Sequence, residues 1–101
     1  MGAAIKPPAS LGDVGRDKWG QLQPKLRGGG QAALDQLEIY CAAYERWVQA
    51  QRWLDEHGDV LEIVNDKGVI LKAQPAPKLD VAARAEKAMS EAMKALRVRL
   101  T

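Results

Sequence analysis

The sequence is poor in the residues from which most active sites and cross-links are built. Its 101 residues include one cysteine, one histidine and no phenylalanine. A single cysteine cannot form an internal disulfide, and the ligand spacing of a structural zinc site is absent. Without a Gly-rich phosphate loop or paired nucleophile and base, no catalytic constellation can be assembled. We therefore predict a protein that is not an enzyme and that uses no metal and no cofactor.

Long apolar runs are missing as well. Nowhere do 18 consecutive apolar residues occur, so the sequence predicts no membrane span. The first ten residues carry one charge and no apolar run of signal-peptide length. Both absences predict a cytoplasmic protein, and the length allows one domain with a thin core.

Charge is distributed unevenly although the net value is only +2. Residues 1–30 and 78–101 each carry +3, whereas residues 31–57 carry −3 and residues 58–77 carry −1. Basic ends attract phosphates, so they are the candidate nucleic-acid surface. The alternative is that they are ordinary solvated helix faces.

The first third of the chain predicts an arm, a short helix and a joint. Residues 1–12 mix Pro, Gly and small residues without periodicity, so we expect a mobile arm before a single domain over residues 13–101. Apolar residues at helical spacings predict a short helix from Asp13 to Leu26 that Pro24 kinks or ends. Three glycines, Gly28 to Gly30, then form a flexible joint.

The strongest helical pattern follows this joint. One apolar stripe consists of Leu34, Leu37, Cys41, Tyr44 and Val48. Asp35 and Glu38 resemble a capping box, so we expect the helix to start near Asp35, and Gly58 is a plausible stop.

The last part of the chain predicts a β-hairpin and another helix. Residues 60–64 and 69–73 are rich in β-branched residues and flank a connection of Asn, Asp, Lys and Gly, so a hairpin is expected at about 60–73. A lone hairpin is marginally stable and has two free edges, so it must pack on the helices or pair with another chain. The pattern is helical again from Lys78 to about Arg99, with Pro77 near the first turn.

The predicted fold is mainly α with one β-hairpin, in the order short helix, long central helix, hairpin and C-terminal helix. Aromatic side chains point in several directions around the central helix, so one neighbouring helix cannot cover them all. In so small a domain the missing cover most simply comes from other copies of the chain, which predicts an oligomer.

The order and spacing of these elements resemble the compact helix–hairpin–helix small subunits of tailed-phage terminases. The resemblance covers about residues 14–100. It is carried by four pieces: Trp19-x-x-Leu22 with Pro24 and Leu26; Asp35-x-Leu37-x-x-Tyr40-Cys41-x-x-Tyr44-x-x-Trp47 with Ala50, Leu54 and Gly58; the Asn65-Asp66-Lys67-Gly68 turn; and Gln74-Pro75-Ala76 before a helix with Ala85 and Met89. Two departures are Gln74, where His or Asn is common, and the Leu96-Arg97-Val98-Arg99-Leu100 ending.

The resemblance implies a component of the viral genome-packaging motor that acts in the host bacterial cytoplasm. Such subunits form homo-oligomeric rings, recognise double-stranded viral DNA and regulate the terminase large subunit, which holds the ATPase and nuclease. The alternative is a small oligomeric adaptor or regulator that binds only protein, through the hairpin edge or the acidic central helix.

Two sets of residues are predicted to carry these roles. We expect the DNA-binding set to be Arg16, Lys18, Lys25, Arg27, Arg97 and Arg99. Packing within and between subunits is expected from Leu37, Tyr44, Trp47, Val48, Met89, Met93 and Leu96.

Other chemically suggestive residues have simpler structural explanations. The three tryptophans are expected in the core or at a subunit interface, and are less well explained as stacking platforms for single strands. Cys41 is expected to be a buried, inert thiol, and His57 to interact with a helix C-terminus. The acidic cluster Asp55, Glu56, Asp59 and Glu62 fits no calcium loop, so no metal site is predicted there.

Overall fold

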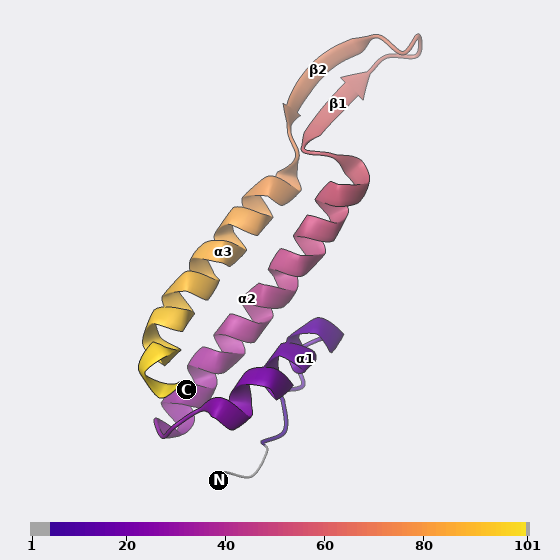
Figure 1. Ribbon diagram of the computed structural model, residues 1–101. Helices are drawn as coiled ribbons and strands as arrows, with labels where there is room; N and C mark the ends of the chain where they lie inside the picture. Colours follow the sequence, from indigo (N-terminus) through magenta and orange to yellow (C-terminus); the bar gives the residue numbers. More distant parts are fainter. Residues whose placement is uncertain (1–4, 101) are drawn as a thin grey trace.

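The computed structural model describes residues 5–100 and consists of a long helical pair that carries a β-hairpin at one end and a short helix near the other (Figure 1). This arrangement confirms the predicted fold class. No helix of residues 5–100 is long and apolar enough to cross a membrane. The elements in chain order are α1 (Asp13–Leu22), the 3₁₀ turn η1 (Gln23–Lys25), α2 (Gly30–His57), β1 (Val60–Val64), β2 (Ile70–Pro75), α3 (Pro77–Leu96) and the 3₁₀ turn η2 (Arg97–Arg99).

The helices α2 and α3 pack antiparallel along their length and form the main body of the molecule (Figure 1). Small buried side chains on both helices allow their backbones to approach closely. They are Ala33, Ala43 and Ala50 on α2, and Ala82, Ala85 and Ala92 on α3. The predicted placement of Pro77 is confirmed, since it occupies the first turn of α3, where a missing N–H costs no hydrogen bond.

The two ends of α2 differ in how well the sequence predicted them. The predicted stop is confirmed, because Gly58 adopts φ +85° and donates its N–H to the Leu54 carbonyl at 2.7 Å. The predicted start near Asp35 is wrong, because the helix begins at Gly30. Gly29 turns the chain with φ +88°, and Asp35 accepts a hydrogen bond from the Gln31 side chain at 2.9 Å within the helix, so it is not a cap.

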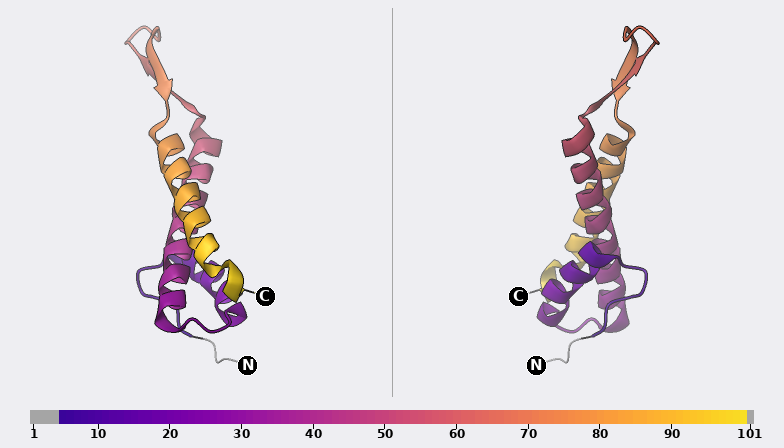
Figure 2. Two further views of the ribbon diagram at one scale, coloured as in Figure 1. Left: turned by 90° about the vertical axis from the view of Figure 1, so that its left-hand side faces the viewer. Right: turned by 90° about the vertical axis from the view of Figure 1, so that its right-hand side faces the viewer.

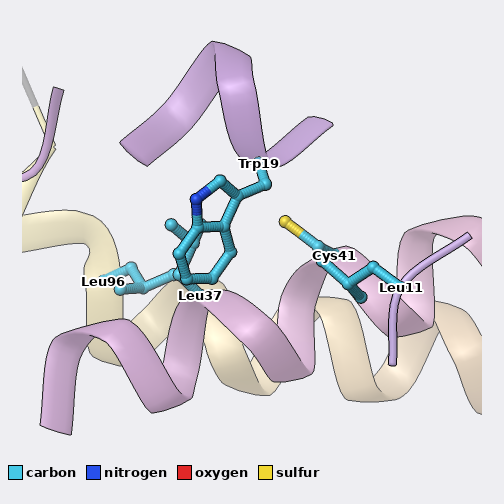
Figure 3. Close-up of a cluster of buried hydrophobic side chains, with 5 residues drawn as sticks. All are labelled: Leu11, Trp19, Leu37, Cys41 and Leu96. Atoms are coloured by element: carbon cyan, nitrogen blue, oxygen red, sulfur yellow. The ribbon is translucent and has the colours of Figure 1, made fainter. Parts of the chain in front are cut away.

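The core gathers where α1 crosses the end of the helical pair that lies away from the hairpin (Figures 1 and 3). Leu37, Cys41 and Leu96 are fully buried, and Trp19 and Leu11 close the cluster from α1 and the segment before it. The Trp19 indole N–H donates to the carbonyl of Ile5 at 2.8 Å, so burial of this aromatic leaves its polar group satisfied.

The segment before α1 differs from the arm expected over residues 1–12. Residues 1–4 lie outside the described part of the chain. From Ile5 onward the segment runs against the helices: the Ile5 N–H donates to the Gln23 side chain at 3.0 Å, Ser10 donates to Glu38 at 3.0 Å, and Leu11 is only 2% exposed. The packing of Leu11 against distant helices left no periodic signal in the sequence.

The N-terminus of α1 is capped from another helix. Gly12 precedes α1 and offers no side chain, so the backbone N–H groups of Gly12 and Gly15 donate to the Glu45 carboxylate of α2 at 2.9 and 3.2 Å. A carboxylate there satisfies donors that the helix itself cannot pair and complements the positive end of the helix dipole. Glu45 therefore fixes the docking of α1 on α2.

The hairpin continues the long axis of the molecule beyond the helices (Figure 2). Its strands β1 and β2 pair antiparallel, and Asn65 closes the turn by accepting the N–H groups of Lys67 and Val69 at 2.9 and 3.0 Å. The chain consequently measures 64 × 23 × 19 Å with a radius of gyration of 17.9 Å. A compact chain of this length would have a radius of about 13 Å.

Candidate nucleic-acid interface

The structure joins the two basic segments at the end of the molecule opposite the hairpin (Figure 1). Leu26 and Leu100 form an isolated antiparallel bridge, and the backbone N–H of Arg27 donates to the carbonyl of Arg99 at 2.7 Å. The glycine joint is therefore tied to the C-terminal turn. Basic residues from the first and last parts of the sequence therefore lie at the same end of the molecule.

We define the terminal basic cluster as Lys25, Arg27, Arg97 and Arg99. The first three side chains are exposed, and Arg99 is half-buried. The Arg99 side chain lies across Gly29, where an added Cβ would stand 2.7 Å from both Cδ and Nε of Arg99. Glycine at this position thus allows both the positive φ and the close approach of the arginine.

The cluster carries unopposed positive charge. Segments 23–29 and 97–100 contain its four basic residues and no acidic one. Among residues 5–100, no acidic side chain forms an ion pair with any of the four. Such a surface suits phosphate oxygens, which Lys and Arg contact without reading base sequence.

The other two residues of the predicted DNA-binding set lie on α1 and have partners of their own. Arg16 is 3.8 Å from Asp13, and its side chain is half exposed. The Lys18 ammonium lies 4.4 Å from the centre of the Tyr44 ring and 3.2 Å from the Gln21 side-chain oxygen. The structure therefore divides the predicted set into four unpaired terminal bases and two engaged bases on α1.

Lys94 is a base that the predicted set omitted. It is exposed in the last turn of α3, directly before the C-terminal part of the cluster. The absence of any acid after Glu91 in the sequence was the signal that could have included it.

A groove of about 350 Å³ lies between α1 and α2. Tyr44 and Val48, both predicted to pack within and between subunits, line it together with Lys18, Arg52, Asp13 and Asp17. Its mixed charges do not form a phosphate site, and its apolar floor is half-buried.

The remaining residues predicted to pack subunits fall into two groups. Leu37 and Leu96 are fully buried in the core of their own chain, and Met93 packs against that core. Trp47 and Met89 are half-buried. Trp47 also joins α2 to α3, because its indole N–H donates to the Glu86 carboxylate at 2.9 Å.

Cys41 and His57, whose side chains could in principle be reactive, occupy positions in which they serve packing and the end of a helix. Burial raises the pKa of the Cys41 thiol to about 11, with Lys18 opposing the effect, so the thiol stays protonated. His57 ends α2, where its Nδ1 lies 3.0 Å from the Trp53 carbonyl and its ring stacks on Trp53 at 4.3 Å. Within residues 5–100 no group of three His, Cys, Asp or Glu side chains is arranged to hold a metal ion.

The fold and the terminal basic cluster define a small, mainly helical protein with a basic surface at one end. Comparison with known families is specific: the model for the phage terminase small subunit matches residues 15–98. The chain therefore belongs to the family of phage terminase small subunits, which confirms the resemblance found in the sequence. No match is found among curated proteins or among solved structures.

Proposed function

We propose that this protein is the DNA-recognition and regulatory component of a viral genome-packaging motor, without catalytic activity of its own. It works as a ring-shaped homo-oligomer in the host bacterial cytoplasm, positions double-stranded viral DNA and modulates the large ATPase and nuclease subunit. Family membership supports the general role. The terminal basic cluster is the observation that supports DNA binding.

The cluster supports binding to the DNA backbone. The four bases lie in or beside two 3₁₀ turns and an isolated strand bridge, and not in an α-helix that could enter a major groove. One chain can neutralise few phosphates, but a ring repeats the cluster and raises the overall affinity through effective concentration. Arg16 and Lys18 contribute less, because Asp13 and Tyr44 already engage them.

The test is neutralisation of the cluster in a salt titration. The variant K25Q/R27Q/R97Q/R99Q should bind double-stranded DNA far more weakly than the parent while keeping its oligomeric mass. The slope of log K against log salt should also become shallower, by about 0.9 for each phosphate that the variant no longer neutralises.

A matched control removes the same number and types of bases elsewhere. Arg46, Arg52, Arg84 and Lys87 are all exposed on α2 and α3, so R46Q/R52Q/R84Q/K87Q causes the same loss of net charge. If both variants weaken binding equally, overall charge and not the cluster drives binding. If neither does, the assignment of the cluster is wrong.

The rival function is an adaptor that binds only protein. The exposed apolar residues of the hairpin favour it, since partner proteins are held by such anchors. Its binding would change little between about 50 and 200 mM salt, whereas binding to phosphates falls steeply over this range.

A further inference from the structure

The hairpin gathers an apolar surface that its own chain leaves open to water. Val60, Val64, Ile70 and Leu71 are 53%, 52%, 55% and 65% exposed. Figures 1 and 2 show the hairpin projecting past the ends of α2 and α3, with no element of residues 5–100 packed over it. An isolated two-stranded hairpin is marginally stable in water, so this hairpin needs a further strand or a packing partner to be stable.

Strand register places these apolar residues on one face. Side chains alternate along a strand, so Val60, Glu62 and Val64 share a face of β1. Paired residues also share a face: Glu62 pairs with Ala73, and Val64 pairs with Ile70.

A β-bulge completes the apolar face. Ile63 pairs with Lys72 and Val64 with Ile70, so Leu71 has no partner on β1. Leu71 is two residues from Ala73 in β2, so its side chain lies on the same face as that of Ala73. Ile70 pairs with Val64, so its side chain lies on the same face as that of Val64. We call the resulting surface the hairpin face; its members are Val60, Val64, Ile70, Leu71 and Ala73, with Glu62 as its one charge.

The two edges of the hairpin are unpaired and opposite in charge. The segment of β1 and the residue before it carry Asp59 and Glu62, whereas β2 carries only Lys72. Pairing of β1 with β1 of another copy would bring acids together, and pairing of β2 with β2 would bring lysines together. Pairing of β1 with β2 brings Lys72 to the acidic edge, where Asp59 shares its face by alternation and Glu62 lies on the other face.

The geometry points to a second copy of this chain as the occupant: β2 of one subunit pairs with β1 of the next, and the hairpin faces of all subunits turn to the same side. This arrangement pairs the free edges, and in a closed ring the hairpin faces on the inner side cover one another. Because the contact is head-to-tail, it repeats around equivalent copies, and a rotation between neighbours that closes gives a ring. The inference rests on the proposed function only for the existence of a ring, and it assigns the contact that closes it.

The size of the exposed surface fits this partner. The chain exposes 6932 Å², whereas a compact monomer of its mass exposes about 5,600 Å². The excess of about 1,300 Å² lies between the areas that one and two standard interfaces remove from a partner. Nucleic acid is a poor occupant of the hairpin, because residues 59–75 carry a net charge of −1.

The first test removes the apolar face without removing strand propensity. V64T/I70T/L71T should lose the assembled species in light scattering after size exclusion and elute as the monomer, with its far-ultraviolet helical signal retained. The control I39T/V81T/V98T changes apolar residues exposed on α2, α3 and η2, and should keep the parent mass. Assembly that survives the hairpin substitutions, or fails equally in the control, overturns the inference.

The second test addresses the edges and leaves the apolar residues in place. D59K/E62K gives both edges positive charge, and K72E gives both edges negative charge. At low salt each variant should be smaller than the parent, and a 1:1 mixture should exceed both in mass. A mixture no larger than its components overturns head-to-tail pairing. DNA binding by the parent is measured separately, so an intact ring without hairpin dependence refutes this contact and leaves the proposed function standing.

Discussion

At the scale of single residues, Cys41 illustrates how position determines chemistry. It lies on the apolar stripe of α2, is fully buried and packs with Trp19 and Leu37. Burial disfavours the thiolate and raises the pKa of the thiol to about 11 from 9.0. The thiol is therefore a packing group, and its ionisation is coupled to folding.

Labelling with a thiol reagent tests this coupling. Because the thiolate is the reactive form, ionisation alone should make labelling at pH 8 about a hundredfold slower in the folded chain than in urea. The folded chain also holds the proton above pH 9, where the unfolded chain releases it. Stability is thus expected to fall as the pH rises from 9.0 towards about 11. Rapid labelling of the folded chain at pH 8 would contradict the account.

The sequence contained enough to find such residues but not their long-range partners. Periodicity alone placed Leu37 and Cys41 on the buried stripe. The Glu45 carboxylate, in contrast, caps Gly12 and Gly15 from about thirty residues away, and an acid in a helix looks solvated in sequence. Lys18 was counted as a free base for the same reason, although it lies over Tyr44.

At the scale of elements, short sequence patterns correctly predicted helix ends and strands that depend on neighbouring residues alone. As expected, α2 ends at Gly58 and α3 begins at Pro77, and the hairpin strands coincide with the segments rich in β-branched residues. The start of α2 was missed because a tertiary contact sets it: the Arg27–Arg99 hydrogen bond and the turn at Gly29 fix where the helix begins. A two-residue bridge has no strand pattern to detect, so the joining of the basic segments was also invisible.

Two glycine substitutions test the joint. G29A introduces a side chain at φ +88° and within 2.7 Å of the Arg99 side chain, so it should lower the free energy of unfolding by about 1–3 kcal/mol. G20A lies in α1 with open space around it, so it should raise the free energy of unfolding by about 0.5–1 kcal/mol.

Urea unfolding followed by circular dichroism measures both effects. Equal stability changes of the same sign would show that Gly29 is an ordinary flexible residue. G29A should also weaken DNA binding more than G20A does, because displacing Arg99 disturbs the terminal basic cluster.

At the scale of the whole molecule, the chain is organised as two distant surfaces on one rod. The terminal basic cluster lies at one end and the hairpin at the other, along the 64 Å axis (Figure 1). The sequence predicted both features separately. Their separation depends on the antiparallel course of α2 and α3, which returns η2 to the end of the molecule where α2 begins. In our proposal one end binds DNA while the other joins the subunits.

Both proposals depend on assembly of the chain into a closed oligomer. The decisive experiment is the absolute mass of the unmodified chain, by light scattering after size exclusion at several concentrations and at low and high salt. We expect one discrete species several times the 11.0 kDa chain mass that persists on dilution. A monomer under all of these conditions would contradict it.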